Sequence, residues 1–243
     1  MTETIHIAHT LPTRISRAVS DFIRMFRDVR FWVWTLMLVG GFAYVSGCLC
    51  GRLNPLASRE GGYGELAKVL MAAPLLFFLG PRHNLEPPDA DWRRILLKNG
   101  LGYLLFFFAG LQWWWFQRIP NVNYSLKWSD LSRMHPAGRA VYLAGALVIV
   151  VLAVYHCRLA RKQGILIPYL STMLGGIFLL AAISWVVRGH FYYHIHHYFF
   201  FCYFIPWTRF KDPVSLACQG FSVGVYVEGV SEWSMAPLWY PLG

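Results

Sequence analysis

The feature that most constrains this chain is a series of long apolar stretches, nearly free of charge, that recur from residue 31 to the end. A stretch of about 20 apolar residues is long enough to cross a bilayer as a helix. Only 14% of the residues are charged, whereas a soluble domain carries about a quarter. The sequence therefore predicts an all-α, multi-pass helical membrane protein without a sizeable soluble domain.

Polar linkers separate seven candidate membrane segments, at residues 31–51, 63–80, 99–117, 140–157, 165–187, 190–207 and 214–230. The segment 63–80 is the weakest, because Glu65 and Lys68 lie in its first turn, where they can pair at i, i+3. Whether it spans the bilayer fully is left open. The expected organisation is an N-terminal segment 1–30, a five-segment bundle 31–187 and a C-terminal helical hairpin 188–243.

Residues 13–30 predict an amphipathic helix ahead of the first membrane segment, since apolar residues recur there at helical spacing between basic ones. A helix of this kind lies in the interface of an anionic leaflet. An uncleaved mitochondrial import signal is compatible with the same pattern. The side chains predicted to contact lipid headgroups are Arg14, Arg17, Arg24, Arg27 and Arg30.

The formal net charge of +10 comes from basic residues in the short linkers between the apolar segments. This placement is typical of membrane topology, not of a nucleic-acid-binding face, so no nucleic acid partner is expected. The linkers on the N-terminal side of the membrane hold more Lys and Arg than those on the other side. By the positive-inside rule, the N-terminus lies on the matrix or cytoplasmic side.

A run of histidines opens the sixth segment, with His190, His194, His196 and His197 within eight residues. On a helix, His190, His194 and His197 would share one face, because they are spaced i, i+4, i+7. Neutral imidazoles on one face are good metal ligands and good proton carriers. We therefore expect the functional site here.

The last two segments can form a hairpin that turns near residues 209 and 210, which places Glu228 at the depth of the histidines and Glu232 near Arg188. A carboxylate with imidazoles suits zinc, iron or manganese, and it equally suits a proton relay. In the alternative, the histidines only bind lipid phosphate, water or backbone carbonyls. The predicted metal-binding residues are His190, His194, His197 and Glu228.

Several short motifs of the hairpin carry a family resemblance: His194-Ile-His196-His197-Tyr198, Thr208-Arg209-Phe210, Pro213-Val-Ser215-Leu-Ala-Cys-Gln219-Gly220, Gly224-Val-Tyr-Val-Glu228-Gly229 and Trp233. Together they resemble the C-terminal membrane region of the LCCL-domain multi-pass membrane proteins. The resemblance is confined to the C-terminal hairpin, and the LCCL domain itself is absent. It implies a membrane protein without an established catalytic activity.

The sequence has no Gly-rich phosphate loop and no candidate catalytic triad, so no catalytic residue is assigned. We expect an accessory or structural subunit of a large membrane complex, in an energy-transducing membrane such as the mitochondrial inner membrane. Its partners would be other membrane subunits and anionic phospholipids. The alternatives are a zinc-, iron- or haem-dependent membrane enzyme that uses the histidine face with Glu228, and a small-molecule transporter.

Overall fold

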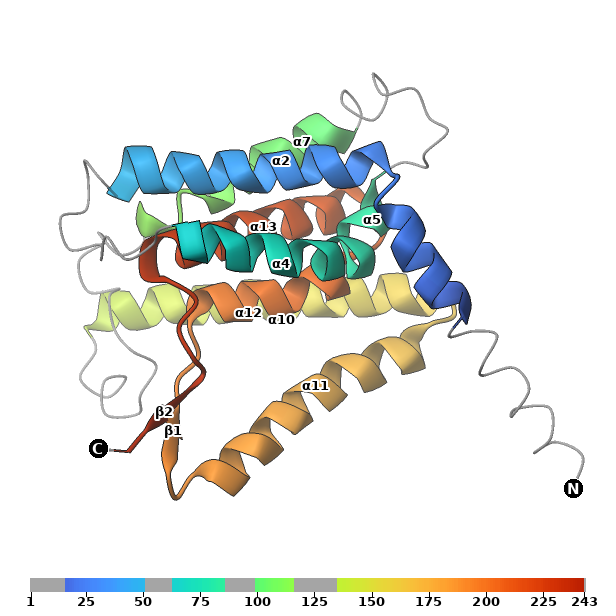
Figure 1. The fold of residues 1–243 in the computed structure, drawn as a ribbon. Helices are drawn as coiled ribbons and strands as arrows, with labels where there is room; N and C mark the ends of the chain where they lie inside the picture. The colour runs from blue at the N-terminus through green and yellow to red at the C-terminus, as the bar shows by residue number, and fades with distance from the viewer. Residues whose placement is uncertain (1–15, 51–62, 86–98, 116–134, 243) are drawn as a thin grey trace, which may run out of the picture.

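The computed structural model describes residues 16–50, 63–85, 99–115 and 135–242, and most of these residues are helical (Figure 1). Within these described residues, three helices are long and apolar enough to cross a membrane. They are Val29–Gly47, Pro136–Lys162 and Leu166–Val187. The prediction of an all-α membrane protein is confirmed at this level, and seven complete crossings are not established.

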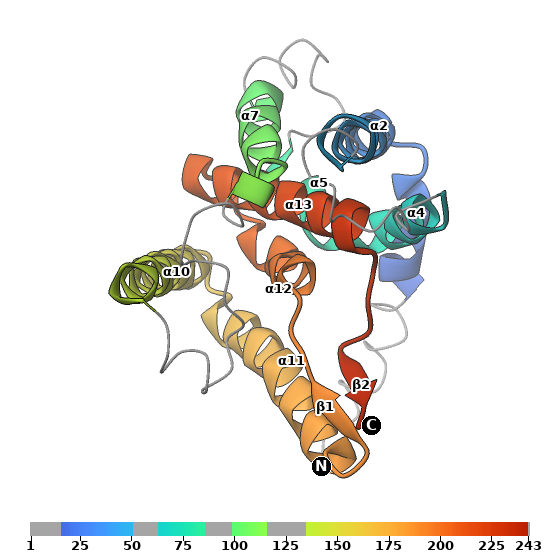
Figure 2. The ribbon, with the colours of Figure 1, turned by 90° about the vertical axis from the view of Figure 1, so that its left-hand side faces the viewer.

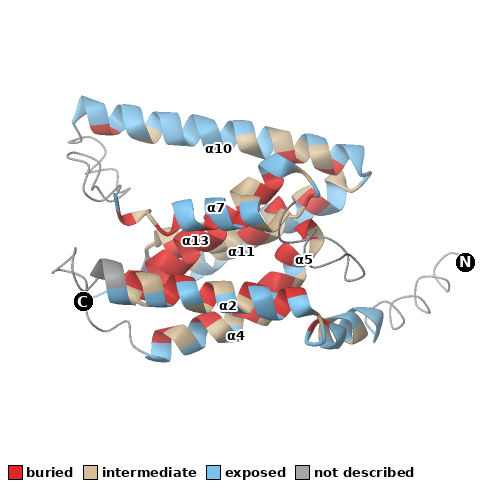
Figure 3. Ribbon diagram, turned by 90° about the horizontal axis from the view of Figure 1, so that it is seen from above, coloured by how far each residue is buried: buried red, intermediate tan, exposed pale blue. Residues whose placement is uncertain are grey.

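Five helices form the body of the molecule, and α13 (Pro213–Trp233) lies at its centre (Figure 2). Every residue of α13 from Ser222 to Glu232 is buried, as the burial colours show (Figure 3). The helices around it are α2 (Val29–Tyr44), α4 (Tyr63–Leu79), α7 (Leu101–Gly110) and α12 (His197–Phe204). The C-terminal residues thus supply the helix on which the others pack.

Two further helices, α10 (Pro136–Lys162) and α11 (Leu166–Val187), lie outside this body, and α11 runs obliquely away from it (Figure 1). Short elements complete the fold. They are the π-helix η1 (Val45–Cys50), α5 (Pro81–Asn84), the 3-10 helix η3 (Ile205–Thr208), and the antiparallel strands β1 (Phe191–Tyr193) and β2 (Trp239–Pro241).

Glycines let α7 and α13 approach each other until their backbones touch. A Cβ at Gly224 would collide with the carbonyl oxygen of Phe107 and would lie 2.9 Å from the Cα of Gly110. A Cβ at Gly220 would lie 2.6 Å from the carbonyl oxygen of Tyr103. Small residues at helix crossings allow this close packing in membrane proteins, and Gly220 and Gly224 have this role between α7 and α13.

The start of α13 is fixed by its own sequence. The Asp212 side chain accepts hydrogen bonds from the backbone N–H groups of Val214 (2.9 Å) and Ser215 (3.2 Å), while Pro213 occupies the first turn. This is the N-cap arrangement that satisfies otherwise unpaired donors. The hydroxyl of Tyr155 in α10 donates to the same carboxylate at 2.8 Å, which ties α10 to the body.

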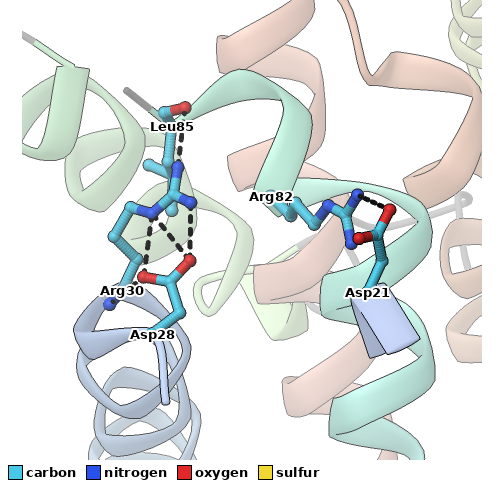
Figure 4. Close-up of polar contacts among 5 residues, drawn as sticks. All are labelled: Asp21, Asp28, Arg30, Arg82 and Leu85. Carbon is cyan, nitrogen blue, oxygen red and sulfur yellow. Dashed lines mark hydrogen bonds and ion pairs between the residues drawn. The ribbon is translucent and has the colours of Figure 1, made fainter. Parts of the chain in front are cut away.

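The N-terminal helix at residues 16–25 packs on the end of the body where α4 ends and α5 lies (Figure 4). We call this the basic end of the body. Arg82 pairs with Asp21 at 3.8 Å, and its guanidinium lies 4.4 Å from the ring centre of Phe78. Burial, with Arg209 and Arg82 nearby, lowers the pKa of His83 to about 4. The imidazole at this end is therefore neutral at physiological pH.

The predicted lipid-contacting arginines divide into three groups. Arg17, Arg24 and Arg27 are exposed, as an interfacial role requires, and Arg14 lies outside the described residues. The prediction that Arg30 contacts lipid is wrong, because Arg30 is 8% exposed and its guanidinium binds the Asp28 carboxylate and the Leu85 carbonyl (Figure 4). The guanidinium of Arg30 thus helps to fix the start of α2.

The predicted segments agree with the structure unevenly. Glu65 and Lys68 form the predicted i, i+3 pair at 2.7 Å, and Leu166–Val187 matches the fifth segment. The third predicted segment, 99–117, contains the α-helix Leu101–Gly110 followed by a turn at 111–113, and its last two residues lie outside the described part of the chain. Helix α4 ends at Leu79, and Pro81 occupies the first turn of α5. At this position the missing N–H of proline costs no hydrogen bond.

We predict that Gly224→Ala lowers the free energy of unfolding by about 2 kcal/mol or more, because the added methyl group meets backbone that cannot move aside. The measurement is reversible unfolding in detergent. Gly40→Ala in α2 is the matched control, since a Cβ there meets nothing within 4 Å, and it should be neutral or stabilising by up to about 1 kcal/mol. Equal changes in the free energy of unfolding at both positions would contradict the close packing of α7 against α13.

Candidate functional site

The histidine run does not form the predicted helix. Residues 188–190 are a turn, β1 follows, and helix α12 begins only at His197. The reason is pairing with the C-terminal tail, in which Tyr192 lies opposite Tyr240 and the two rings stack at 5.4 Å. Because the partner strand lies far along the sequence, local periodicity cannot reveal it.

This backbone path sends the histidines in different directions. His190 is exposed in the turn, while the His196 ring pairs through Nε2 with the Tyr240 hydroxyl at 2.8 Å. The His194 ring packs edge-on against the His196 ring at 4.6 Å. Only His197 reaches the interior of the body, where its Nε2 lies 3.2 Å from Oε2 of Glu228.

The four residues predicted to bind a metal are therefore not brought together. His190, His194 and His197 share no helical face, since only the last of them is in a helix. Among the residues that the structure describes, no three His, Cys, Asp or Glu side chains form a group that could hold a metal ion. What remains of the predicted site is the contact between His197 and Glu228.

The predicted register of the hairpin was wrong by several residues. A turn near residues 209 and 210 sets Glu228 opposite the residues just after His190, whereas the structure places His197 against Glu228 and Gly229. A Cβ on Gly229 would lie 2.7 Å from both Nε2 of His197 and Cβ of Tyr198. Gly229 therefore allows α12 to approach α13 closely enough for the imidazole to reach the carboxylate.

Glu228 is fully buried, with 0% of its surface exposed, and Glu232 is 2% exposed. The two carboxyl groups lie one helical turn apart, within hydrogen-bonding reach of each other. The charge of Glu232 acts on His197, so Glu232 belongs to this cluster. The Trp113 ring stacks over the His197 ring at 6.4 Å. We call His197, Glu228, Glu232 and Trp113 the carboxyl–imidazole cluster.

One atom of this cluster has an unusual environment. Oε2 of Glu228 faces His197, but Oε1 is buried without a hydrogen-bond partner among the described residues. A buried oxygen of a charged carboxylate normally accepts hydrogen bonds, because leaving it unpaired is costly. By contrast, Glu65, a buried glutamate of α4, is satisfied by Lys68 and by the backbone N–H of Met235 at 2.8 Å.

A second polar cluster lies at the opposite end of α13, and the sequence analysis did not foresee it. The Gln219 amide donates to the carbonyls of Ile205 (3.0 Å) and Thr208 (3.1 Å). The Asn84 amide donates to the Thr208 carbonyl at 2.6 Å and to Oε1 of Gln219 at 3.1 Å. These bonds satisfy the carbonyls of η3, where a short 3-10 helix leaves them without partners.

His156, which looked isolated in the sequence, has a structural role near the start of α13. Its Nε2 lies 3.2 Å from the Ser215 hydroxyl, and its Nδ1 lies 2.7 Å from the Leu152 carbonyl. The ring is 4% exposed. It therefore anchors α10 to α13 and is not a candidate for haem ligation beside the histidine run.

Comparison with family models, with curated proteins and with solved structures found no match for this chain. The resemblance of the hairpin to the LCCL-domain proteins stays a prediction.

We predict that Gln219→Leu lowers the free energy of unfolding by about 1–3 kcal/mol, because the carbonyls of Ile205 and Thr208 and the Asn84 amide lose buried partners. Denaturation in detergent measures the effect. Gln163→Leu, at an exposed position where α10 ends, serves as the control and should change stability by less than about 0.5 kcal/mol. A neutral Gln219→Leu variant would contradict the assigned role.

Proposed function

We propose that this chain is an integral membrane subunit of a larger, hetero-oligomeric membrane complex. The observation that carries the proposal is the exposure of α10 and α11. They are 27 and 22 residues long, and only 6% and 0% of their most apolar windows are buried within the chain. A helix of 27 residues is about 40 Å long, so α10 exceeds a hydrocarbon core of about 30 Å.

Both helices are attached to the body at restricted points. In α10, the contacts lie in the C-terminal half, through Tyr155, His156 and Ala160. In α11, the Tyr169 hydroxyl donates to the Trp207 carbonyl at 3.0 Å, and near the other end Ser184 accepts from the Trp239 indole at 3.0 Å. Between these points the Tyr203 hydroxyl donates to the Met173 carbonyl of α11. The faces of both helices that turn away from these contacts are exposed and available to another protein.

The composition of these faces supports helix packing against a partner. Gly145 in α10 and Gly175 in α11 have open space where a Cβ would be. Glycine inside a helix costs about 1 kcal/mol relative to alanine unless close packing uses it. In membranes, helices associate through van der Waals contact at such small residues. Apolar helices of other subunits are therefore the proposed occupants.

We place the complex in an energy-transducing membrane, with the mitochondrial inner membrane as the specific proposal. The basic side chains Arg82, Arg209 and Lys211 all act on His83 at one end of the body. The basic last turn of α10, with Arg161 and Lys162, and the start of α2 lie at that same end (Figure 1). A cationic end of this kind favours the matrix side and binds anionic phospholipids.

We expect the native protein, extracted in mild detergent, to migrate well above the size of one 28.0 kDa chain with its detergent. A photo-crosslinking residue placed at Phe178 (75% exposed) or Leu147 (65% exposed) should form adducts with other proteins. The same residue at Val223 (0% exposed) is the control and should form none. Migration as a single chain, without adducts from α10 or α11, would contradict the proposal.

The orientation is tested by cysteine accessibility in mitoplasts. With a membrane-impermeant thiol reagent, Leu242→Cys should be labelled above the background of the native cysteines, because it is 52% exposed on the side opposite the basic end. Lys162→Cys should react only after the membrane is opened. The reverse labelling pattern would refute the orientation, and absence of the protein from mitochondria would refute the location.

A further inference from the structure

We propose that the carboxyl–imidazole cluster is an internal proton-binding site, in which Glu228 carries a proton and shares it with Glu232, and which exchanges protons through His197. This inference goes beyond the proposed subunit role and does not depend on it. It begins from the unpartnered Oε1 of Glu228, in a side chain with 0% exposure.

The chemistry of two neighbouring carboxyl groups explains how that oxygen is satisfied. Glu232 lies within hydrogen-bonding reach of Glu228, but two ionised carboxylates are both acceptors and cannot bond to each other. A single proton on Oε1 turns the contact into a donor–acceptor pair. It also removes a charge that burial would make costly and relieves the repulsion between the two groups.

His197 supplies the connection to the surface. Its side chain is 27% exposed, while that of Glu228 is fully buried, and the two are joined by the 3.2 Å contact between Nε2 and Oε2. The imidazole therefore touches the outside of the body on one side and the buried carboxyl group on the other. Imidazole carries protons well, because one ring nitrogen can accept a proton while the other releases one.

A transfer through the cluster can be written with all atoms conserved. A proton binds Nδ1 of neutral His197; the Nε2–H bond then breaks and an O–H bond forms at Oε2 of Glu228. The O–H bond at Oε1 breaks, and that proton passes to the Glu232 carboxylate. His197 ends neutral, Glu228 still holds one proton, and Glu232 has gained one. The reverse sequence unloads the site.

Several other titratable groups near the cluster have partners of their own, whereas the Tyr226 hydroxyl on α13 is buried without a hydrogen-bond partner among the described residues. From α4, Glu65 is held by Lys68. On the segment before α12, His196 pairs with Tyr240, and His194 packs against His196. From α12, the Tyr198 hydroxyl donates to the Ala236 carbonyl. The element that covers the remaining side contributes the Trp113 ring, which cannot titrate. Ionisable groups held in the interior of a membrane protein typically handle protons or ions.

The test is infrared spectroscopy of the full chain in lipid nanodiscs at pH 7, with glutamate labelled by ¹³C. The proposal predicts a carboxylic acid C=O band that shifts with the glutamate label. The band should disappear in Glu228→Gln and remain in Glu65→Gln, the matched control with a partnered carboxylate. In Glu228→Asp, an acid band should remain without the isotope shift.

A wild-type spectrum without a protonated glutamate would overturn the proposal, and this result does not depend on any variant folding. A band that survives unchanged in Glu228→Gln would also overturn it. For the route, His197→Gln should keep the band but slow its hydrogen–deuterium exchange several-fold. An unchanged exchange rate would refute exchange through His197.

Discussion

The burial of α13 is the constraint on which the rest of the structure depends. A helix surrounded by protein on all sides must satisfy its polar side chains inside the molecule, and α13 carries several of them from Ser215 to Glu232. Gln219 binds the carbonyls of η3, and Ser231 pairs with Ser46 at 2.7 Å. Surrounding helices can provide these partners only because glycines let them come close. Packing and polar pairing therefore depend on each other along the whole helix.

The burial of α13 also distinguishes two parts of the molecule, the body that surrounds α13 and the outer helices α10 and α11. The body encloses polar groups and short helices such as α7 and α12, which are too short to cross a bilayer alone. By contrast, α10 and α11 are long, apolar and exposed. Polar contacts join them to the rest of the chain, between His156 of α10 and Ser215 of α13 and between Ser184 of α11 and the Trp239 indole. The body is thus suited to hold a chemical site, and the two outer helices are suited to bind lipid or protein.

Apolar stretches and local charge spacing were sufficient to predict the three membrane-length helices and the Glu65–Lys68 pair, because these features depend on neighbours in the sequence. The path of the histidine run could not be predicted, since β1 forms only by pairing with residues 239–241. Asn84 gave no signal, because its partners are Gln219 and the Thr208 carbonyl, far along the chain. The sequence predicted that Glu228 faces a histidine, but not which one. The register between α12 and α13 depends on η3 and on the close approach at Gly229, which together place His197 opposite Glu228.

Helix α12 packs on α13 so that the imidazole of His197 meets the buried carboxyl group of Glu228. A double-mutant cycle with His197→Leu and Glu228→Leu, read as free energies of unfolding in detergent, tests it most directly. Each single substitution leaves the other polar side chain without its partner. The double variant should therefore lose less stability than the sum of the losses of the two single variants, with a coupling energy of about 1 kcal/mol or more. Losses that add within about 0.5 kcal/mol would show that the two side chains do not interact, and would contradict the account.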